Sequence, residues 1–265
     1  DKAGIAEILT MIERIQTENR PHGMICVAFT PDEEIGMGAE HFNLDQFGAE
    51  YAYTLDGDSE GEIQYENFNA CKAEFEIRGF NVHPGEGKDT MINASLVAIE
   101  INNCLPSMET PRGTEDYEGF YHLISMQGEV GEAKLNYIVR DHDKNGFEER
   151  KKTLRLIEKN LNAKWGEGTV TLKITDQYLN MKEIVEEHMH LIDHAKKACE
   201  AAGVAPLILP IRGGTDGCQL SFKGLPCPNL GTGGHAFHGP YEHISVEGME
   251  KSVELLLALI QEYTK

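Results

Sequence analysis

An acidic turn directly after an apolar run is the feature that most limits what this chain can fold into. The run Met24–Phe29 has the length and composition of a buried strand. The turn Thr30–Gly36 follows it, and there Glu33 and Glu34 lie between a proline and a glycine that interrupt regular structure. Open α/β sheets bind ligands at the carboxyl ends of their strands. The pattern therefore predicts a buried parallel strand over 24–30 with a functional site at its end.

Two adjacent carboxylates are costly to hold side by side unless a positive group lies between them. A divalent metal ion with an activated water molecule supplies that charge. One glutamate then binds the ion while the other takes a proton from the water. A solvated acidic loop has the same residues, because one short motif is only a hypothesis.

The composition disfavours several classes of partner. The 265 residues carry a net charge of −20, which argues against binding to a nucleic-acid backbone or an anionic membrane. No apolar run reaches the length of about 20 residues that spans a bilayer, and no stretch has the pattern of a signal peptide. The six cysteines are scattered without a C-x-x-C pair. This spacing favours reduced thiols in a cytoplasmic protein.

Hydrophobic periodicity predicts an α/β fold with an inserted α+β domain. The insert, residues 68–178, has the order strand-helix-strand-strand-helix-strand, which is ferredoxin-like. The expected elements are, in chain order, helix 4–18, strand 24–30, helix 38–42, strand 51–55, strand 73–78, helix 90–103, strands 120–128 and 133–140, helix 146–162, strand 169–174, helix 182–202, strand 206–210 and helix 246–263.

Four residues at the ends of strand-like segments are the best candidates for chemistry. They are Glu33, Glu34, Asp56 and His238. Carboxylate and imidazole ligands suit zinc, cobalt or manganese and leave coordination positions for water. Taken singly, His238 also fits an ordinary loop histidine, and Asp56 fits a cap of a helix or turn.

Other inviting residues have weaker patterns. His188, His190 and His194 lie close together on a charged helix, but there is no H-E-x-x-H motif. Gly36–Gly38 lacks the rest of a dinucleotide-binding fingerprint. Without a G-x-S-x-G motif a serine hydrolase has no nucleophile elbow. No local signature marks Cys218 as catalytic, so we expect it to be a buried small residue.

Five motifs, in order, make the chain resemble the tripeptide aminopeptidases of the M20 family of co-catalytic metallopeptidases. They are Val27–Gly36, Thr54–Gly57, Asn81–Gly85, Ile211–Gly217 and Phe237–Gly239, and the resemblance runs over essentially the whole length. It implies a zinc-peptidase-like catalytic domain formed by residues 1–67 and 179–265, with residues 68–178 as an inserted lid or dimerisation domain. It also implies two zinc ions, with cobalt or manganese as alternatives.

The resemblance implies a role for each matching residue. Glu33 is similar to the general base, Glu34 and Asp56 are similar to ligands of different metal ions, and His238 is similar to the histidine that completes one metal site. His83 is similar to the group that stabilises the oxyanion. Arg212 is similar to the group that binds the substrate's carboxylate or backbone oxygen, and Asn93 is similar to a polar substrate contact. An ordinary solvated helix position fits Asn93 equally well. Because His83 lies in the insert, the resemblance also implies domain closure before chemistry.

Two parts of the family pattern have no counterpart in this chain. The family has an upstream His-x-Asp motif, and a metal-bridging aspartate two positions before the residue that corresponds to Lys2. Asp1 stands one position too late for that role. We therefore expect a catalytic domain that is incomplete at its N-terminus, with a poorly ordered first sheet and exposed apolar surface. We also expect no activity from this chain alone.

Two other functions fit the same residues. Another M20 hydrolase, such as an aminoacylase or an N-acyl amino-acid deacylase, would use the same mechanism on a different substrate. A non-catalytic fragment would use residues 68–178 only for association. The motifs Thr54–Gly57 and Arg212–Gly217 favour the tripeptidase branch. The expected partners are therefore tripeptides and, through the insert, a second copy of the chain.

Overall fold

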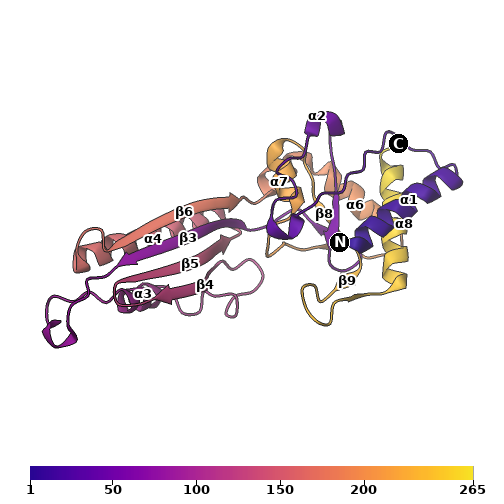
Figure 1. Cartoon of the computed structure of the whole chain (residues 1–265). Coiled ribbons are helices and arrows are strands. Elements are labelled where there is room, and N and C mark those ends of the chain that lie inside the picture. The colour runs from indigo at the N-terminus through magenta and orange to yellow at the C-terminus, as the bar shows by residue number, and fades with distance from the viewer. Residues whose placement is uncertain (265) are drawn as a thin grey trace. The chain divides into compact units, whose positions relative to one another are not determined.

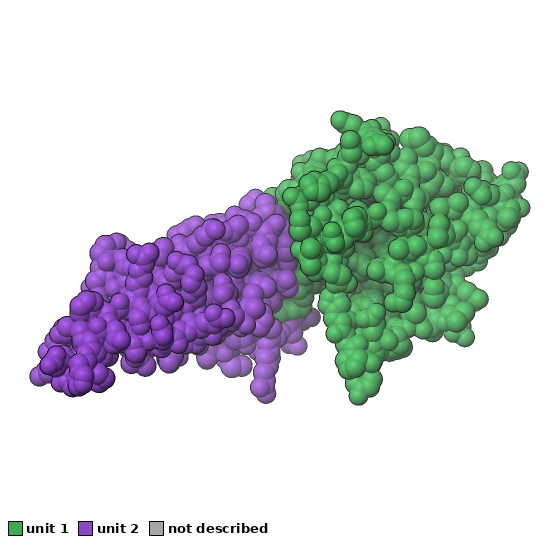
Figure 2. All heavy atoms as spheres, viewed as in Figure 1, with its two compact units in different colours: residues 1–67, 180–265 green, residues 68–179 purple. Residues whose placement is uncertain are grey.

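A computed structural model describes residues 1–264 and divides the chain into two compact units (Figures 1 and 2). Unit 1 consists of Asp1–Asn67 and Asn180–Lys265, and unit 2 of Phe68–Leu179. Figure 2 shows unit 1 in green and unit 2 in purple. The domain boundaries expected from the sequence differ from these only in the placement of Leu179.

Unit 2 is a four-stranded antiparallel sheet with two long helices. Its elements are β3 (Asn69–Arg78), η2 (Pro84–Glu86), α3 (Ala94–Asn103), β4 (Phe120–Gly128), β5 (Glu132–Asp141), α4 (Lys144–Trp165) and β6 (Val170–Tyr178). The strands lie in the order β4-β5-β3-β6, and each neighbouring pair is antiparallel. The element order is the β-α-β-β-α-β order expected from the sequence.

Alternation along the strands builds the core of unit 2. Every second residue of β3 between Cys71 and Ile77 is buried, while those between them are half-buried or exposed. Phe75 of β3 belongs to one apolar cluster together with Ile101 of α3 and Leu154 of α4. Because both helices contribute to that single cluster, they cover the same face of the sheet.

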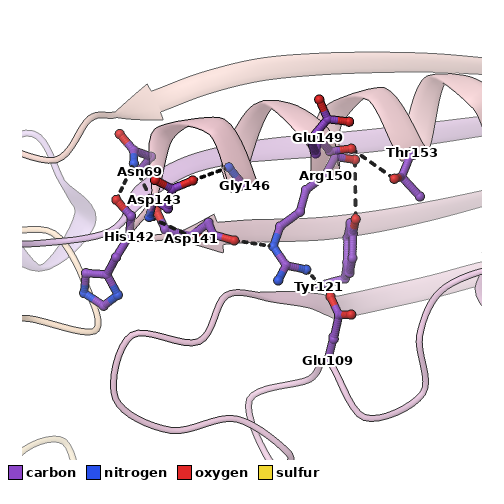
Figure 3. A network of polar contacts seen from close by, with 10 residues as sticks. All are labelled: Asn69, Glu109, Tyr121, Asp141, His142, Asp143, Gly146, Glu149, Arg150 and Thr153. Carbon is purple, nitrogen blue, oxygen red and sulfur yellow. Dashed lines mark hydrogen bonds and ion pairs between the residues drawn. The ribbon is translucent and has the colours of Figure 1, made fainter.

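Arg150 on α4 joins three parts of unit 2 (Figure 3). Its Nε donates a hydrogen bond to Asp141 Oδ2 over 2.7 Å, and its Nη1 pairs with Glu109 in the segment before β4. The guanidinium carbon also lies 5.0 Å from the centroid of the Tyr121 ring on β4. These charge-assisted contacts fix the first turns of α4 against the end of the sheet.

Unit 1 is built around a short mixed sheet. Its elements are α1 (Lys2–Thr17), η1 (Glu33–Ile35), α2 (Leu44–Phe47), β1 (Thr54–Gly57), β2 (Glu62–Gln64), α5 (Lys182–Val185), η3 (Glu186–His188), α6 (His190–Ala201), β7 (Leu207–Ile208), α7 (Asp216–Lys223), β8 (Asn229–Gly231), β9 (Gly234–His235), β10 (His243–Ile244) and α8 (Val246–Glu262). The strand order is β1-β8-β2-β7, while β9 and β10 form a separate antiparallel ribbon. Helix α8 packs against both α1 and α6.

The strand expected at residues 24–30 does not form. Residues 21–30 contain neither helix nor strand, and the side chain of Met24 is 82% exposed. No strand of unit 1, within the described residues, pairs with this segment. A lone strand leaves its backbone groups unpaired, so the prediction of a buried parallel strand was wrong here. The expected exposure of apolar surface is observed, because Val27 and Phe29 are also exposed.

Capping explains several smaller differences from the expected elements. Helix α1 begins at Lys2 because Asp1 Oδ1 accepts a hydrogen bond from the Gly4 amide over 2.9 Å. The helix expected at 38–42 is a turn, and α2 begins after Asn43, whose side chain accepts from the Gln46 amide. The single helix expected at 182–202 is divided, because Glu186–His188 tighten into a 3₁₀ turn.

None of the helices in the described residues is long and apolar enough to cross a membrane.

Candidate active site

The acidic turn forms a short 3₁₀ helix with a left-handed residue at each end. Asp32 before it has φ of 62°, and Gly36 after it has φ of 73°. Glycine adopts this conformation freely, and aspartate does so more readily than most residues. Glu33 is half-buried and Glu34 is exposed. The turn therefore separates the environments of two adjacent carboxylates.

Glu34 contacts a histidine that is far from it in the sequence. His238 Nε2 lies 3.1 Å from Glu34 Oε2. His238 lies in the loop between β9 and β10 with φ of 61°, and its amide donates to Glu242 over 3.2 Å. The structure thus brings two of the expected metal ligands into contact. Their side chains are 77% and 72% exposed, so the pair is open to ions from solvent.

Glu33 and Asp56 share an acidic environment. Burial raises the pKa of Glu33 to about 7, and the charges of Asp56 and Asp216 contribute further. Desolvation also raises the pKa of Asp56, which lies within β1 rather than after a strand. Glu34 adds to that increase, whereas His238 opposes it. A bound cation would relieve this concentration of negative charge.

Asp216 is a member of this acidic group that the sequence did not single out. It begins α7, and only 5% of the residue is exposed. Its Oδ2 accepts a hydrogen bond from Thr30 Oγ1 over 2.6 Å, whereas its Oδ1 is buried without a partner among residues 1–264. The signal was present in the glycine-rich loop that precedes α7, where only Arg212 had been assigned a role.

The carboxylate oxygens and the imidazole nitrogen of this site are atom types that bind divalent metal ions, but they do not form a complete ligand set. Carboxylate and imidazole groups are typical zinc ligands. In the part of the chain that the structure describes, no three or more His, Cys, Asp or Glu side chains gather closely enough to hold a metal ion. Glu34 and His238 therefore form a pair of donors. Asp56 lies near enough for the charges of both residues to affect its pKa.

The other expected site residues come from a loop of unit 1 and from unit 2. Arg212 is half-buried in the loop between β7 and α7 of unit 1. In unit 2, His83 is exposed before η2, and its Nδ1 accepts a hydrogen bond from the Gly85 amide over 3.2 Å. Asn93 is the N-cap of α3, because its Oδ1 accepts from the Leu96 amide over 3.3 Å. Asn93 thus has a structural task within its own unit.

The three clustered histidines form a row of aromatic rings. The ring centroids of His190 and Tyr51 are 4.6 Å apart, and those of His194 and Tyr263 are 4.7 Å apart. His188 lies beside the same Tyr51 ring. Each of the three histidine rings thus packs against a tyrosine ring.

Cys218 is buried, as expected from the sequence. Its Sγ donates to the Thr215 carbonyl over 2.9 Å, and burial raises the pKa of the thiol to about 11. A thiol in this state is not an activated nucleophile.

The comparisons with known proteins place the chain in a family. The family model for peptidase family M20/M25/M40 matches residues 1–262. This chain belongs to that family. Among curated relatives, this M20 chain is similar to peptidase T of Halothermothrix orenii, with 54% identity over 264 residues, 99% of this chain and 65% of the relative. The chain thus spans about two-thirds of the length of that relative.

Solved structures of M20 peptidases have a similar fold. Aminopeptidase PepT from Bacillus cereus superposes with a TM-score of 0.86 and 26% identity over 100% of this chain and 71% of that chain. A dinuclear metal-binding peptidase of the M20 family from Bacillus subtilis has a TM-score of 0.65 and 16% identity, over 89% of this chain and 64% of that chain. The predicted family and α/β fold class are confirmed.

Proposed function

We propose that this chain is part of a tripeptide aminopeptidase, which removes the N-terminal residue of a tripeptide at a dinuclear metal centre. The contact between Glu34 and His238 carries the proposal, because it joins an oxygen and a nitrogen donor beside the acidic Glu33. The 54% identity to a peptidase T supports a peptide substrate over an N-acyl amino acid.

Zinc is the metal that we propose. Glu34 and His238 would hold one ion and Asp56 the other, and cobalt or manganese would accept the same donors. Bound metal would polarise the scissile carbonyl and lower the pKa of a water molecule. The raised pKa values of Glu33 and Asp56 support this proposal, since like charges crowd where a cation would bind.

Glu33 is the proposed general base. A half-buried carboxyl with a pKa of about 7 can exchange a proton near neutral pH. It would accept a proton from water and return it to the leaving amine. Arg212 would hold the carboxylate or a backbone oxygen of the peptide, because a guanidinium fork donates two parallel hydrogen bonds.

His83 is the proposed oxyanion donor. Its Nδ1 accepts the Gly85 N–H, so a neutral ring carries its hydrogen on Nε2. An Nε2–H is the kind of donor that stabilises a developing oxyanion. The Oδ1 of Asn93 is used in capping α3, which leaves its amide N–H groups as the part that would contact the substrate.

We also propose that unit 2 serves as a lid and as a homodimer interface, and that the protein works in the cytoplasm. The edge strand β4 and helix α3 both carry exposed apolar side chains, among them Ile124 and Leu96. The six cysteines are all free thiols, as is usual in a reducing compartment. The net charge of −20 disfavours nucleic acid as a partner.

The decisive experiment compares this chain with a version completed to the full length of its peptidase T relatives. Each is incubated with zinc or cobalt and either trialanine or N-acetylalanine. We expect the completed chain to release alanine from trialanine only, and the 265-residue chain to release none. Release of acetate alone would favour an aminoacylase. Hydrolysis by the shorter chain would show that the residues named here suffice.

The association alternative is tested separately on unit 2. Residues 68–179 are expressed alone and their mass is measured by analytical ultracentrifugation. Dimers of unit 2 together with an inactive completed chain would favour a purely associative role. Monomers would contradict the homodimer proposal without affecting the tripeptidase proposal.

A further inference from the structure

Two histidines outside the proposed catalytic site face each other across the β9–β10 ribbon. His235 and His243 are direct partners in the antiparallel register. Their ring centroids are 5.3 Å apart, and the ring planes are inclined by 36°. Both residues are exposed. Neither has a role in the function proposed above.

The hydrogen bonding of His243 determines which ring nitrogen is available to a ligand. Its Nδ1 lies 2.8 Å from the carbonyl oxygen of Tyr241. A carbonyl oxygen can only accept, so Nδ1 carries the hydrogen, and Nε2 of the neutral ring keeps its lone pair. Metal-binding histidines commonly donate their other ring N–H to a backbone carbonyl in this way. Within residues 1–264 the ring of His235 has no hydrogen bond, so either nitrogen can bind.

The separation of the rings matches that of two imidazoles on one metal ion. Zinc bound to two ring nitrogens at about 2.0–2.1 Å, with tetrahedral angles, holds the ring centroids about 5 Å apart. His235 and His243 are already at 5.3 Å. The antiparallel strand register, in which His235 and His243 are direct partners, supplies this spacing. Their exposure leaves the other coordination positions to water.

We propose that His235 and His243 form a two-histidine site for a divalent transition-metal ion, separate from the Glu34–His238 pair. Neutral imidazoles favour zinc, nickel and copper over magnesium and calcium. Such a site has two protein ligands, so it is compatible with the finding that no group of three or more ligands occurs among the described residues. A metal bound there ties β9 to β10, and so constrains the loop that carries His238.

The test measures zinc binding to the full chain by isothermal titration calorimetry. His235→Phe and His243→Phe each keep a ring in the cross-strand contact but remove the ligand nitrogen. His22→Phe is the matched control, because His22 is also exposed but lies in a loop elsewhere in unit 1. We expect either ribbon variant to lose one zinc equivalent, or at least tenfold in affinity, while the control binds as the parent does. Magnesium should not bind at this site.

Two further measurements separate this site from the proposed catalytic centre. The titration is repeated with a variant that carries both Glu34→Gln and His238→Ala. This variant should still bind the one equivalent of zinc that we assign to His235 and His243. In the parent, zinc should shift the Cε1–H resonances of His235 and His243 together in proton NMR spectra. Equal zinc binding by the parent and both ribbon variants, with no shift of these resonances, would overturn the proposal and leave the rings as a cross-strand aromatic pair. Since no hydrolysis is measured, the outcome does not depend on the tripeptidase proposal.

Discussion

The imidazole Nε2 of His238 lies 3.1 Å from the Glu34 carboxylate, although the two residues belong to different segments of the chain within unit 1. Both side chains are well exposed, so their attraction adds little to the stability of the fold. The contact matters because it places a nitrogen and an oxygen donor side by side. Metal binding and folding stability should therefore respond differently when the pair is broken.

Replacing His238 by alanine should weaken zinc binding at the Glu34 site at least tenfold and change the thermal unfolding temperature by no more than a few degrees. The variant loses a metal ligand, whereas the ion pair that it loses is worth about 1 kcal/mol or less. Competition with a chromogenic chelator measures the affinity, and calorimetry measures the unfolding. His41→Ala serves as the control, because His41 is an exposed histidine of the same unit. Parent-like zinc affinity in the His238 variant would remove this residue from the proposed site.

Replacing Glu33 by glutamine in the completed enzyme should lower the turnover of trialanine by about 10²–10⁴-fold, the usual contribution of a general base. Zinc affinity should stay close to that of the parent, since Glu33 is assigned to proton transfer rather than to a metal. Asp32→Asn is the matched control, because asparagine also tolerates the left-handed backbone at φ of 62°. Comparable losses from both substitutions would mean that the turn needs its total charge, and would contradict a specific role for Glu33.

Local patterns in the sequence predicted unit 2 well. The alternation over Ala73–Arg78 predicted a strand, and a strand forms there because a neighbouring strand and a core are available. The apolar face of α4, which includes Leu154 and Leu161, likewise follows from helical spacing. The same reasoning failed at residues 24–30, because a strand also needs a partner, and no neighbouring strand lies within the described sheet. Whether a neighbouring strand is present depends on the tertiary structure, and the periodicity of a single segment does not show it.

For the candidate active site, too, the sequence predicted individual residues but not which of them contact each other. The family motifs indicated both Glu34 and His238, but only the folded chain shows that they touch. Asp216 was overlooked because its effect on Glu33 arises from tertiary contacts, among them the hydrogen bond that Thr30 donates to Asp216. The glycine-rich loop before α7 marks this region, but its sequence does not show which residues lie beside Asp216.

Glu7 should make the stability of unit 1 depend on pH. Only 1% of this residue of α1 is exposed, both carboxylate oxygens lack a partner among the described residues, and burial raises its pKa from 4.5 to about 8. The folded state therefore keeps a proton that the unfolded chain releases above a pH of about 4.5. The contribution of Glu7 to stability is therefore fully present below that value and is lost as the pH rises toward 8.

Glu7→Gln, which is neutral at every pH, should consequently stabilise the chain more at pH 8 than at pH 5. The difference between the two gains should reach up to about 3 kcal/mol. Chemical denaturation at both values measures it. Glu13→Gln changes an exposed residue of the same helix and should show no such dependence. Equal gains for Glu7→Gln at the two pH values would show that this carboxyl is not held protonated by folding.

Unit 2 should fold as an independent domain, because its apolar cluster is formed entirely by its own residues. In a chain of residues 68–179, Leu154→Ala should lower the free energy of unfolding by about 2–5 kcal/mol, since Leu154 is fully buried between α4 and the sheet. Leu156→Ala makes the same chemical change on the same helix, but Leu156 is 56% exposed, so its effect should stay within about 0.5 kcal/mol. Urea unfolding of the two variants tests both statements. Similar losses for both, or an unfolded parent fragment, would mean that unit 2 depends on unit 1 for its core.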